Sequence, residues 1–305
     1  MTRRDLLAIF SGIRMAPAGA GRAVHKPLLL LFWLARLDRG DPRLARFAEV
    51  EGKFKQLLTE FGSSNSPNTR HLPFWHLCND AGGQVWELQT ASGMQIQAAG
   101  AAPGLAWFHQ NDVRAGFAAP IDEQLRDDPH LRAALARHLL ANHFSETLHA
   151  DIAAQVGLDI DADAGRQIAG RPARRRNPAF RERVLRAYEY RCCVCGFDLR
   201  IGNIAAGLEA AHIQWFTAGG PDVESNGLAM CALHHKLLDL GAFTVEPVNL
   251  TIRFSQNLQL GESTKVHLLS YHGAGIIQPQ SQTYTPERKY LEWHGRTVFK
   301  KPGRD

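Results

Sequence analysis

Four residues in the second half of the chain have the types and the spacing of a zinc site. Cys192 and Cys195 form a C-x-x-C pair, and Cys231 and His234 repeat the spacing in MCALHH. Structural zinc is held by four thiolate or imidazole ligands, commonly supplied as two such pairs. If the second pair lies on a helix, positions i and i+3 share a face, so both donors can reach one ion. We therefore predict one structural Zn²⁺ per chain.

The remaining cysteines are consistent with this prediction. The chain has five cysteines, an odd number, and three of them lie between residues 192 and 195. This pattern favours metal binding in a reducing compartment over a disulfide framework. A C-x-x-C pair alone would leave redox chemistry open, and the second pair is what favours zinc. Cys193 and Cys78 are left over and are predicted to be small buried residues.

Three polar residues accompany the zinc pairs, namely His212 in LEAAHI, Asn226 in ESNGLAMC, and His235. LEAAHI is predicted to be a strand, residues 219–221 a loop, and the residues from Asn226 onward a turn into a helix. His235 follows His234 by one residue, which rotates it by about 100° around a helix and away from the zinc. Taken singly, these residues could be a core histidine, a helix cap and a surface histidine.

Together the motifs resemble the HNH endonucleases. The pattern C-x-x-C, LEAAHI, GPD-x-x-SNGLAMC and LHH-x-LLDLG is similar to the HNH domains of Mcr-type restriction enzymes, and it covers residues 180–254. The resemblance implies a zinc-stapled ββα-metal fold and a metal-dependent DNA endonuclease. It implies His212 as general base and His235 as a ligand of a catalytic Mg²⁺ or Mn²⁺. Asn226 would either reach that ion or orient His212.

One position departs from the family pattern. Many relatives carry Asp or His directly before the first histidine as a further metal ligand, and this chain has Ala211 there. Glu209 lies on the same strand, but alternation predicts that it points to the face opposite His212, which makes it a poor substitute. Asp239, one helical turn after His235, could be an outer partner of the metal site or a surface charge. The coordination of the catalytic ion is therefore left open.

The elements that position these residues fall into two predicted domains. The 305 residues, of which 45% are hydrophobic and 21% charged, suit a globular α+β protein with two cores. We expect a mixed helix and strand DNA-reading domain at 1–150, a linker at 151–176 and the HNH domain at 177–305. In the first domain, helices are predicted over Arg43–Phe61 and Pro129–Leu148, and a strand at QVWELQ.

Charge and hydropathy restrict the partners and the location. The net charge is +5, and residues 171–186 hold seven arginines against one acid. A solvated linker and a phosphate-binding surface both fit this stretch, and we predict that Arg181, Arg183 and Arg186 contact the DNA backbone. The apolar run at 28–35 is shorter than the about 20 residues of a membrane-spanning helix, so a buried helix is predicted. With no export signal visible, we expect a cytoplasmic protein without membrane contact.

Two segments of the first domain, GRAVHKPLLLLFWL and NTRHLPFWHL, resemble the sulfur-binding domain of restriction enzymes that recognise phosphorothioated DNA. The resemblance implies phosphorothioated double-stranded DNA as partner and an apolar pocket for sulfur around Pro73. It places His25, Lys26, Arg22 and His71 on the phosphates or bases. Sulfur is more weakly hydrated than oxygen, so an apolar contact favours it. The same segments could simply be core elements.

These motifs lead to a type IV restriction endonuclease that recognises phosphorothioated DNA and cuts nearby. Two alternatives stay open, a nuclease that reads methylated or hydroxymethylated cytosine and a zinc-containing DNA-binding regulator that does not cut. Cutting both strands with one active site per chain would require a homodimer or two visits. The recognised bases, the cutting distance and the role of residues 258–305 are not determined by the sequence.

Overall fold

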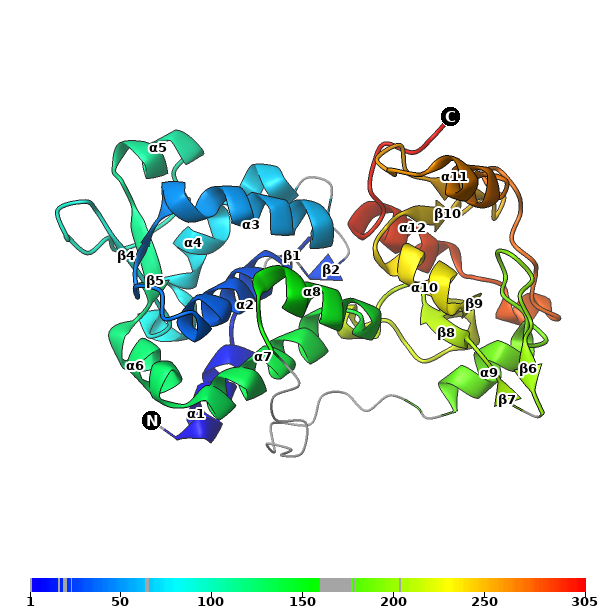
Figure 1. Ribbon diagram of the computed structural model, residues 1–305, viewed down its shortest axis with the longest axis horizontal. Helices are drawn as coiled ribbons and strands as arrows, with labels where there is room; N and C mark the ends of the chain where they lie inside the picture. Colours follow the sequence, from blue (N-terminus) through cyan, green and yellow to red (C-terminus); the bar gives the residue numbers. More distant parts are fainter. Residues whose placement is uncertain are drawn as a thin grey trace. The chain divides into compact units, whose positions relative to one another are not determined.

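The computed structural model describes residues 2–15, 24–63, 66–159, 177, 179–202 and 204–305, and only the backbone of residues 17–18 and 21–22. Two units make up the fold, one containing helix α1 (Arg3–Ser11) and residues 24–159, the other containing residues 177–305 (Figure 1). Both combine helices with short antiparallel strands, which confirms the α+β class. Among the described helices, none has the length and apolar character needed to cross a membrane.

The first unit is built around helix α2 (His25–Asp38), which contains the long apolar run. The side chains of residues 28–35 are at most 5% exposed, which confirms the prediction of a buried helix. Helix α2 packs against five other helices of this unit. These are α3 (Phe47–Phe61), α4 (Leu72–Leu77), α6 (Ala119–Asp127), α7 (Pro129–His143) and α8 (His149–Val156), while α5 (Leu105–Gln110) packs against α3.

A three-stranded sheet completes this unit in the order β3-β5-β4, with β3 (Ala45–Arg46), β4 (Trp86–Gln89) and β5 (Arg114–Phe117). The predicted strand at QVWELQ is therefore present as β4. Helix α3 begins at Phe47, four residues later than predicted, because Ala45 and Arg46 pair with β5. Helix α7 ends at His143, five residues before the predicted end. A further two-stranded sheet joins β1 (Pro17–Ala18) to β2 (Gly21–Arg22).

The predicted linker at 151–176 begins inside a helix. Residues 151–156 belong to α8, where Ile152, Ala153 and Val156 are buried. A left-handed Gly157 with φ of 84° ends the helix, as a C-cap glycine commonly does. The first unit therefore extends past residue 150, and residues 160–176 of the predicted linker lie outside the described residues.

The centre of the second unit is a hairpin followed directly by a helix. Strands β8 (Leu208–His212) and β9 (Gly227–Cys231) are antiparallel, with His212 opposite Gly227, and helix α10 (Ala232–Asp239) starts at the next residue. The predicted strand at LEAAHI is confirmed. The prediction of a turn into a helix from Asn226 was wrong, because residues 227–231 form a strand first. Residues 227–230 are all buried, so this strand lacks the alternation that would have revealed it.

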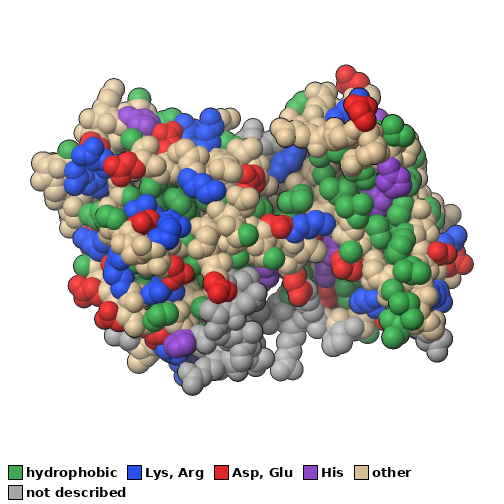
Figure 2. Space-filling model, in the orientation of Figure 1, with side chains coloured by type: hydrophobic (Ala, Val, Ile, Leu, Met, Phe, Trp, Pro, Cys, Tyr) green, Lys and Arg blue, Asp and Glu red, His purple; other side chains and the backbone are tan. Residues whose placement is uncertain are grey.

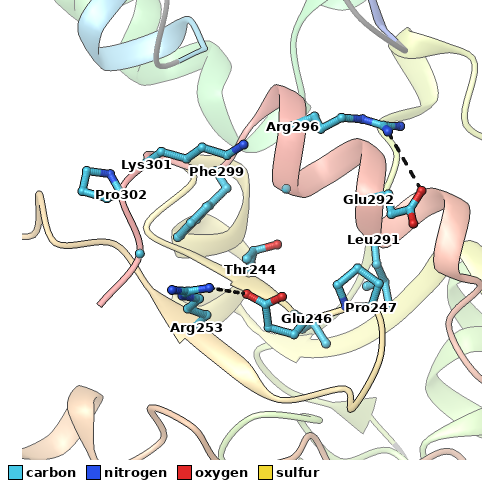
Figure 3. A pocket seen from close by; sticks show the side chains of 13 residues that line it. Thr244, Glu246, Pro247, Arg253, Leu291, Glu292, Arg296, Phe299, Lys301 and Pro302 are labelled. Carbon is cyan, nitrogen blue, oxygen red and sulfur yellow. Dashed lines mark hydrogen bonds and ion pairs between the residues drawn. The ribbon is translucent and has the colours of Figure 1, made fainter. Parts of the chain in front are cut away.

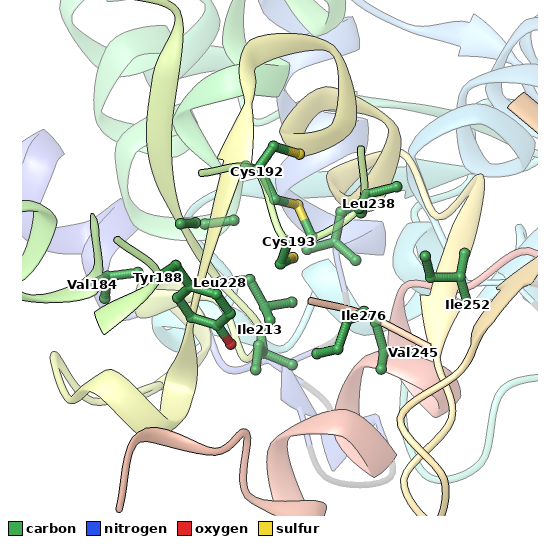
Figure 4. Close-up of a cluster of buried hydrophobic side chains, with 14 of the residues drawn as sticks. Val184, Tyr188, Cys192, Cys193, Ile213, Leu228, Leu238, Val245, Ile252 and Ile276 are labelled. Carbon is green, nitrogen blue, oxygen red and sulfur yellow. The ribbon is translucent and has the colours of Figure 1, made fainter. Parts of the chain in front are cut away.

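Further elements surround this ββα unit, namely α9 (Phe180–Ala187), β6 (Arg200–Ile201), β7 (Ile204–Ala205), β10 (Phe243–Val245), β11 (Ile252–Phe254), α11 (Glu262–Leu269) and α12 (Arg288–Thr297). Helix α9 packs across both strands of the hairpin, and a Cβ at Gly227 would lie 2.4 Å from Cγ2 of Val184. Cys193 is fully buried in the same core as Tyr188 and Ile213, as predicted for a leftover cysteine (Figure 4). Cys78 is only partly buried.

Candidate functional site

The four predicted zinc ligands meet in the second unit. The Sγ atoms of Cys192, Cys195 and Cys231 and a ring nitrogen of His234 all lie within 4.8 Å of one another. Nδ1 of His234 is 3.2 Å from Sγ of Cys231 and 3.6 Å from Sγ of Cys192. Zinc bonds of about 2.3 Å to sulfur and about 2.0 Å to nitrogen place tetrahedral ligands about 3.5 Å apart. The four donor atoms therefore fit a tetrahedral ion.

The local backbone explains how the tetrad forms. Cys192 and Cys195 lie in the turn after α9, where the N–H of Gly196 donates to the carbonyl of Cys192 at 2.9 Å. Cys231 ends β9, and His234 lies in the first turn of α10. Burial is the main cause that raises the pKa of Cys195, and the negative charge of the neighbouring Cys192 sulfur raises it further. Several neighbouring thiolates repel one another, so they can ionise together only when a cation offsets their charge. The crowding of these thiols therefore also fits a zinc site.

His212 lies at the end of β8, between a carboxylate and an aromatic ring. Its Nε2 is 2.8 Å from Oδ1 of Asp222. Its ring stacks on Phe180, the first residue of α9, with centroids 4.0 Å apart and planes at 18°. A carboxylate on one ring nitrogen selects the tautomer with the proton on that nitrogen, which leaves Nδ1 as the basic atom. Such an arrangement would suit a general base.

Asp222 is itself held by one backbone N–H and by a neighbouring arginine. The N–H of Asn177 donates to Oδ2 of Asp222 at 2.7 Å. Arg183 of α9 donates to the carbonyl of Asp222 at 2.7 Å and to Oε1 of Glu224 at 2.8 Å. The loop that carries Asp222 is therefore tied to α9, and the carboxylate meets His212 from a fixed direction.

Asn226 is completely buried and shapes the same loop. Its Oδ1 accepts from the N–H of Gln214 at 2.9 Å, and its Nδ2 donates to the carbonyls of Gln214 and Pro221, each at 3.0 Å. A Cβ at Gly220 would lie 1.8 Å from the Gln214 oxygen, so only glycine fits beside this amide. Of the two predicted roles, orientation of His212 through the loop is the one that these backbone contacts support.

His235 lies between two carboxylates. Its Nδ1 is 2.6 Å from Oε2 of Glu209 on β8, and its Nε2 is 3.3 Å from Oδ2 of Asp239 one turn along α10. Glu209 was expected to be a poor substitute ligand because it points to the face opposite His212, yet it contacts the other candidate histidine. Alternation compared Glu209 only with His212, whereas α10 packs against β8 and brings His235 to Glu209. A hydrogen bond from His235 and the charge of that ring lower the pKa of Glu209 despite its burial.

The two histidines are connected through one strand. Glu209, which contacts His235, precedes His212 by three residues on β8, or about 10 Å of extended chain. A nitrogen and a carboxylate oxygen side by side are ligands suited to Mn²⁺ and Mg²⁺. The residues present therefore fit a divalent ion near His235 and Glu209, although Ala211 offers no donor.

The three arginines of α9 have different surroundings. Arg181 donates to the carbonyl of Leu208 at 2.8 Å and lies close enough to Glu209 to lower its pKa. Arg183 holds the Asp222 loop, which accounts for two of its donors. Arg186 is exposed and pairs with Glu182 at 3.3 Å, a contact that solvent screens. Arg181 and Arg186 remain available to a phosphate, whereas Arg183 has a structural role.

The two sulfur-domain motifs meet at one place in the first unit. His25 begins α2, and its Nε2 is 3.0 Å from Oγ1 of Thr69, the second residue of the other motif. Pro73 is buried in the first turn of α4. The ring of His71 packs against Phe108 at 5.7 Å, and its Nδ1 has no hydrogen-bond partner among the described residues. Burial lowers the pKa values of both histidines, which favours their neutral forms.

Lys26 faces the interior. Its Nζ lies 2.6 Å from Oδ2 of Asp80 and 2.7 Å from the carbonyl of Arg14, and the side chains of Lys26 and Asp80 are 12% and 1% exposed. The ammonium thus neutralises a buried carboxylate. The side chain of Arg22 lies outside the described residues. On the face seen in Figure 2, acidic and basic side chains are interspersed over the first unit.

A separate cavity of about 430 Å³ lies between β10, β11 and α12 (Figure 3). The arginines and glutamates that line it form ion pairs. Nη1 of Arg253 lies 3.2 Å from Oε1 of Glu246, and Nη1 of Arg296 lies 4.0 Å from Oε2 of Glu292. None of the predicted site residues lines this cavity. The candidate catalytic residues therefore belong to the ββα unit and not to this cavity.

Sequence reasoning missed two residues of the site. Asp222 was present in the GPD motif but received no role, because only contact with His212 reveals one. Glu209 was considered and set aside, because strand alternation does not show which helix crosses the hairpin. A carboxylate in a loop within the motif was the available signal for Asp222.

Two families match the chain. Residues 3–161, more than half of the 305, match the ScoMcrA-like DNA sulfur-binding domain. Residues 192–246 match the HNH endonuclease domain, and this range contains both zinc pairs and the ββα unit. No curated protein sequence matches the chain.

Solved structures show similar but distant likenesses. The sulfur binding domain of SprMcrA complexed with phosphorothioated DNA is 23% identical, with a TM-score of 0.43, over 52% of this chain and 95% of that chain. The sulfur binding domain of ScoMcrA complexed with phosphorothioated DNA is 25% identical, with a TM-score of 0.44, over 50% and 94%. The type IV phosphorothioation-dependent restriction endonuclease ScoMcrA is 23% identical, with a TM-score of 0.41, over 57% and 36%.

All three TM-scores are below 0.5, so the assignment rests on the two family matches. The chain belongs to the ScoMcrA-like DNA sulfur-binding domain family, and it joins that domain to an HNH endonuclease domain.

Proposed function

We propose that the protein is a type IV restriction endonuclease that binds phosphorothioated double-stranded DNA through its first unit and hydrolyses nearby phosphodiester bonds with its second. The observation that carries the proposal is the presence of both matched domains in one chain. Neither a reader of modified cytosine nor a regulator that does not cut gains support from a described contact. Its DNA substrate places the enzyme in the cytoplasm.

His212 is proposed as the general base. Hydrolysis requires water to lose a proton while its oxygen bonds to phosphorus, and the leaving oxygen must gain a proton as its bond breaks. Asp222 accepts from Nε2 of His212, so Nδ1 takes the proton from water. Asn226 and Arg183 hold the loop of Asp222, so we assign them positioning roles.

His235 and Glu209 are proposed as the residues that hold a catalytic Mg²⁺ or Mn²⁺. When bound, the ion would stabilise the negative charge that develops on the phosphate and the leaving oxygen. Arg181, beside Glu209, is placed to contact a phosphate near the ion. Cys192, Cys195, Cys231 and His234 would hold structural Zn²⁺ and keep α10 against the hairpin.

For the first unit, we propose that Pro73 forms the apolar contact with sulfur and that His25 and His71 lie at the rim. Support comes from the meeting of the two motifs at Thr69 and from the neutral state that burial favours for both histidines. A neutral imidazole can donate a hydrogen bond to one phosphate oxygen, whereas a positively charged side chain attracts all phosphates regardless of sequence or modification. A homodimer on DNA would supply one active site for each strand.

The decisive experiment measures cleavage of one duplex in three forms, carrying a phosphorothioate, 5-methylcytosine or neither, with Mg²⁺ or Mn²⁺ added. We expect cutting only of the phosphorothioated duplex. His212→Ala should slow cleavage by about 10²–10⁴-fold, since that is the usual contribution of a general base, and should leave DNA affinity within a few-fold. Asp222→Asn should slow it less.

His267→Ala, an exposed histidine on α11, is the matched control and should cut at the wild-type rate. Cleavage of the methylated duplex alone would support a reader of modified cytosine. If the wild-type protein leaves all three duplexes intact with either ion, the non-cutting regulator is the better description.

A further inference from the structure

We propose that Asp239 and Trp215 are positioning residues that fix the ring of His235 for metal binding. The inference rests on the proposed function, in which His235 and Glu209 hold the catalytic ion. Oδ1 of Asp239 accepts from Nε1 of Trp215 at 2.8 Å, while its Oδ2 lies 3.3 Å from Nε2 of His235. Trp215 thus contacts Asp239, and Asp239 in turn contacts His235, the candidate metal ligand.

Burial makes this carboxylate unusual. The side chain of Asp239 is 1% exposed, and taking an ionised carboxylate out of water costs several kcal/mol unless its oxygens are hydrogen-bonded. Oδ1 of Asp239 accepts from the indole of Trp215, and Oδ2 faces the imidazole of His235. A small residue would pack there without that cost, so the carboxylate is best explained by what it does to the ring.

The effect on His235 is a choice of tautomer. In this structure Nδ1 of His235 shares a hydrogen bond of 2.6 Å with Oε2 of Glu209. With a cation between Nδ1 and Glu209, the ring proton would lie on Nε2, where Oδ2 of Asp239, 3.3 Å away, is placed to accept it. Histidines that bind metals commonly donate their second ring N–H to a carboxylate, which orients the ring and makes it a stronger ligand. Asp239 therefore prepares Nδ1 of His235 as the metal-binding atom.

Helix α12 extends this support. The ring of Trp293 packs on Trp215, with centroids 6.0 Å apart at 62°. The adjacent His294 is fully buried, which lowers its pKa to about 4, so it is neutral at pH 7. Its Nε2 donates to the carbonyl of Leu238 at 3.0 Å, and its Nδ1 accepts from the hydroxyl of Thr244 at 2.9 Å. The residue next to Asp239 is thus fixed by a helix outside residues 192–246, the range of the HNH match.

The test is Mn²⁺ binding by the zinc-loaded full-length protein without DNA, measured by the electron paramagnetic resonance signal of free Mn²⁺. We expect the wild type to bind Mn²⁺ and His235→Ala to lose binding. Asp239→Asn should weaken the Kd by about 10–100-fold, the usual effect of removing such a carboxylate. Trp215→Phe should weaken it by a smaller factor. Glu246→Gln, which removes a carboxylate of the same unit from the cavity of Figure 3, should leave the Kd unchanged.

A second readout separates positioning from a general loss of structure. The cleavage rate of Asp239→Asn should recover toward the wild-type value as Mn²⁺ is raised, because the defect is in affinity, whereas a misfolded variant would not recover. Zinc content and melting temperature check the fold. If Asp239→Asn does not fold, Trp215→Phe, which keeps a ring in place, decides.

A folded variant of either residue with a Kd within two-fold of the wild type would overturn the inference while leaving the proposed nuclease intact. Wild-type protein that binds no Mn²⁺ beyond its zinc would overturn the metal assignment at His235 and this inference with it. Loss of DNA cleavage alone, with normal Mn²⁺ binding, would also count against the proposal.

Discussion

The two units hold their candidate sites in different ways. In the second, residues 42 positions apart, Cys192 and His234, converge on one tetrahedral centre, and each candidate catalytic histidine contacts a carboxylate. In the first, Lys26 turns inward to Asp80, and Pro73 is buried in a helix. Metal and acid-base sites need several polar groups in one place, whereas a sulfur pocket needs an apolar surface with few polar contacts. A sulfur pocket, as expected in the first unit, is therefore hard to distinguish from an ordinary part of the hydrophobic core.

The largest effect should come from the zinc ligands. Cys195→Ala should release the zinc and abolish the melting transition of the second unit, because structural zinc contributes about 10 kcal/mol or more to folding. The transition of the first unit should persist. Differential scanning calorimetry with metal analysis measures both.

Cys193→Ala is the control, since this buried thiol lies next to the tetrad without belonging to it, and it should retain one zinc per chain. If the Cys195→Ala variant retained its zinc, Cys195 would not be a required ligand, and the predicted tetrad would be wrong. Simultaneous loss of both transitions would show that the units do not fold separately.

The next effect concerns Lys26 and would sharpen the contrast. Lys26→Met leaves the buried carboxylate of Asp80 with Arg14, whose Nε is 3.5 Å away and whose side chain is 75% exposed. We expect the free energy of unfolding of the first unit to fall by about 3 kcal/mol, measured by urea denaturation, because a buried charge loses its main partner.

The double variant Lys26→Met with Asp80→Asn should recover most of that loss, since no buried charge remains. Unchanged stability combined with weaker DNA binding would instead make Lys26 a phosphate contact. In that case the two units would resemble each other more than this structure indicates.

The smallest effect is expected at Pro73. Pro73→Ala removes part of an apolar surface, so the ratio of the Kd values for the unmodified and phosphorothioated duplexes should fall by up to about ten-fold, or about 1.4 kcal/mol. Fluorescence anisotropy on matched duplexes measures the ratio.

Pro120→Ala, which also changes a proline in the first turn of a helix, should leave the ratio unchanged. An equal ratio for wild type and Pro73→Ala would mean that sulfur is not recognised at this residue.

Much of the fold could be predicted from the sequence, and the predictions that failed did so for physical reasons. The run at 28–35 was recognisable as a buried helix because it is apolar throughout and too short to span a membrane. Strand β9 was missed because it is apolar on both faces and runs directly into α10. The start of α3 was misplaced because pairing of Ala45 and Arg46 with β5 overrides helical periodicity.

The zinc tetrad was predictable in full because each pair already has the spacing of a chelate. The partners of His212 and His235 were only partly predictable. Asp239 follows from helical spacing, whereas Asp222 and Glu209 depend on how a loop and a strand are oriented in space. Burial of Lys26 was not predictable either, because Asp80 lies 54 residues away in the chain.

The bond between His294 and Leu238 spans 56 residues, which has a consequence for protein synthesis. At the usual translation rate of about 5–20 residues per second, α12 leaves the ribosome roughly 3–11 seconds after α10. Until then the carbonyl of Leu238, at the end of α10, lacks the N–H donor that His294 supplies. In a newly made chain, α12 can therefore support α10 only after residue 294 has left the ribosome, when the DNA-reading unit has already emerged.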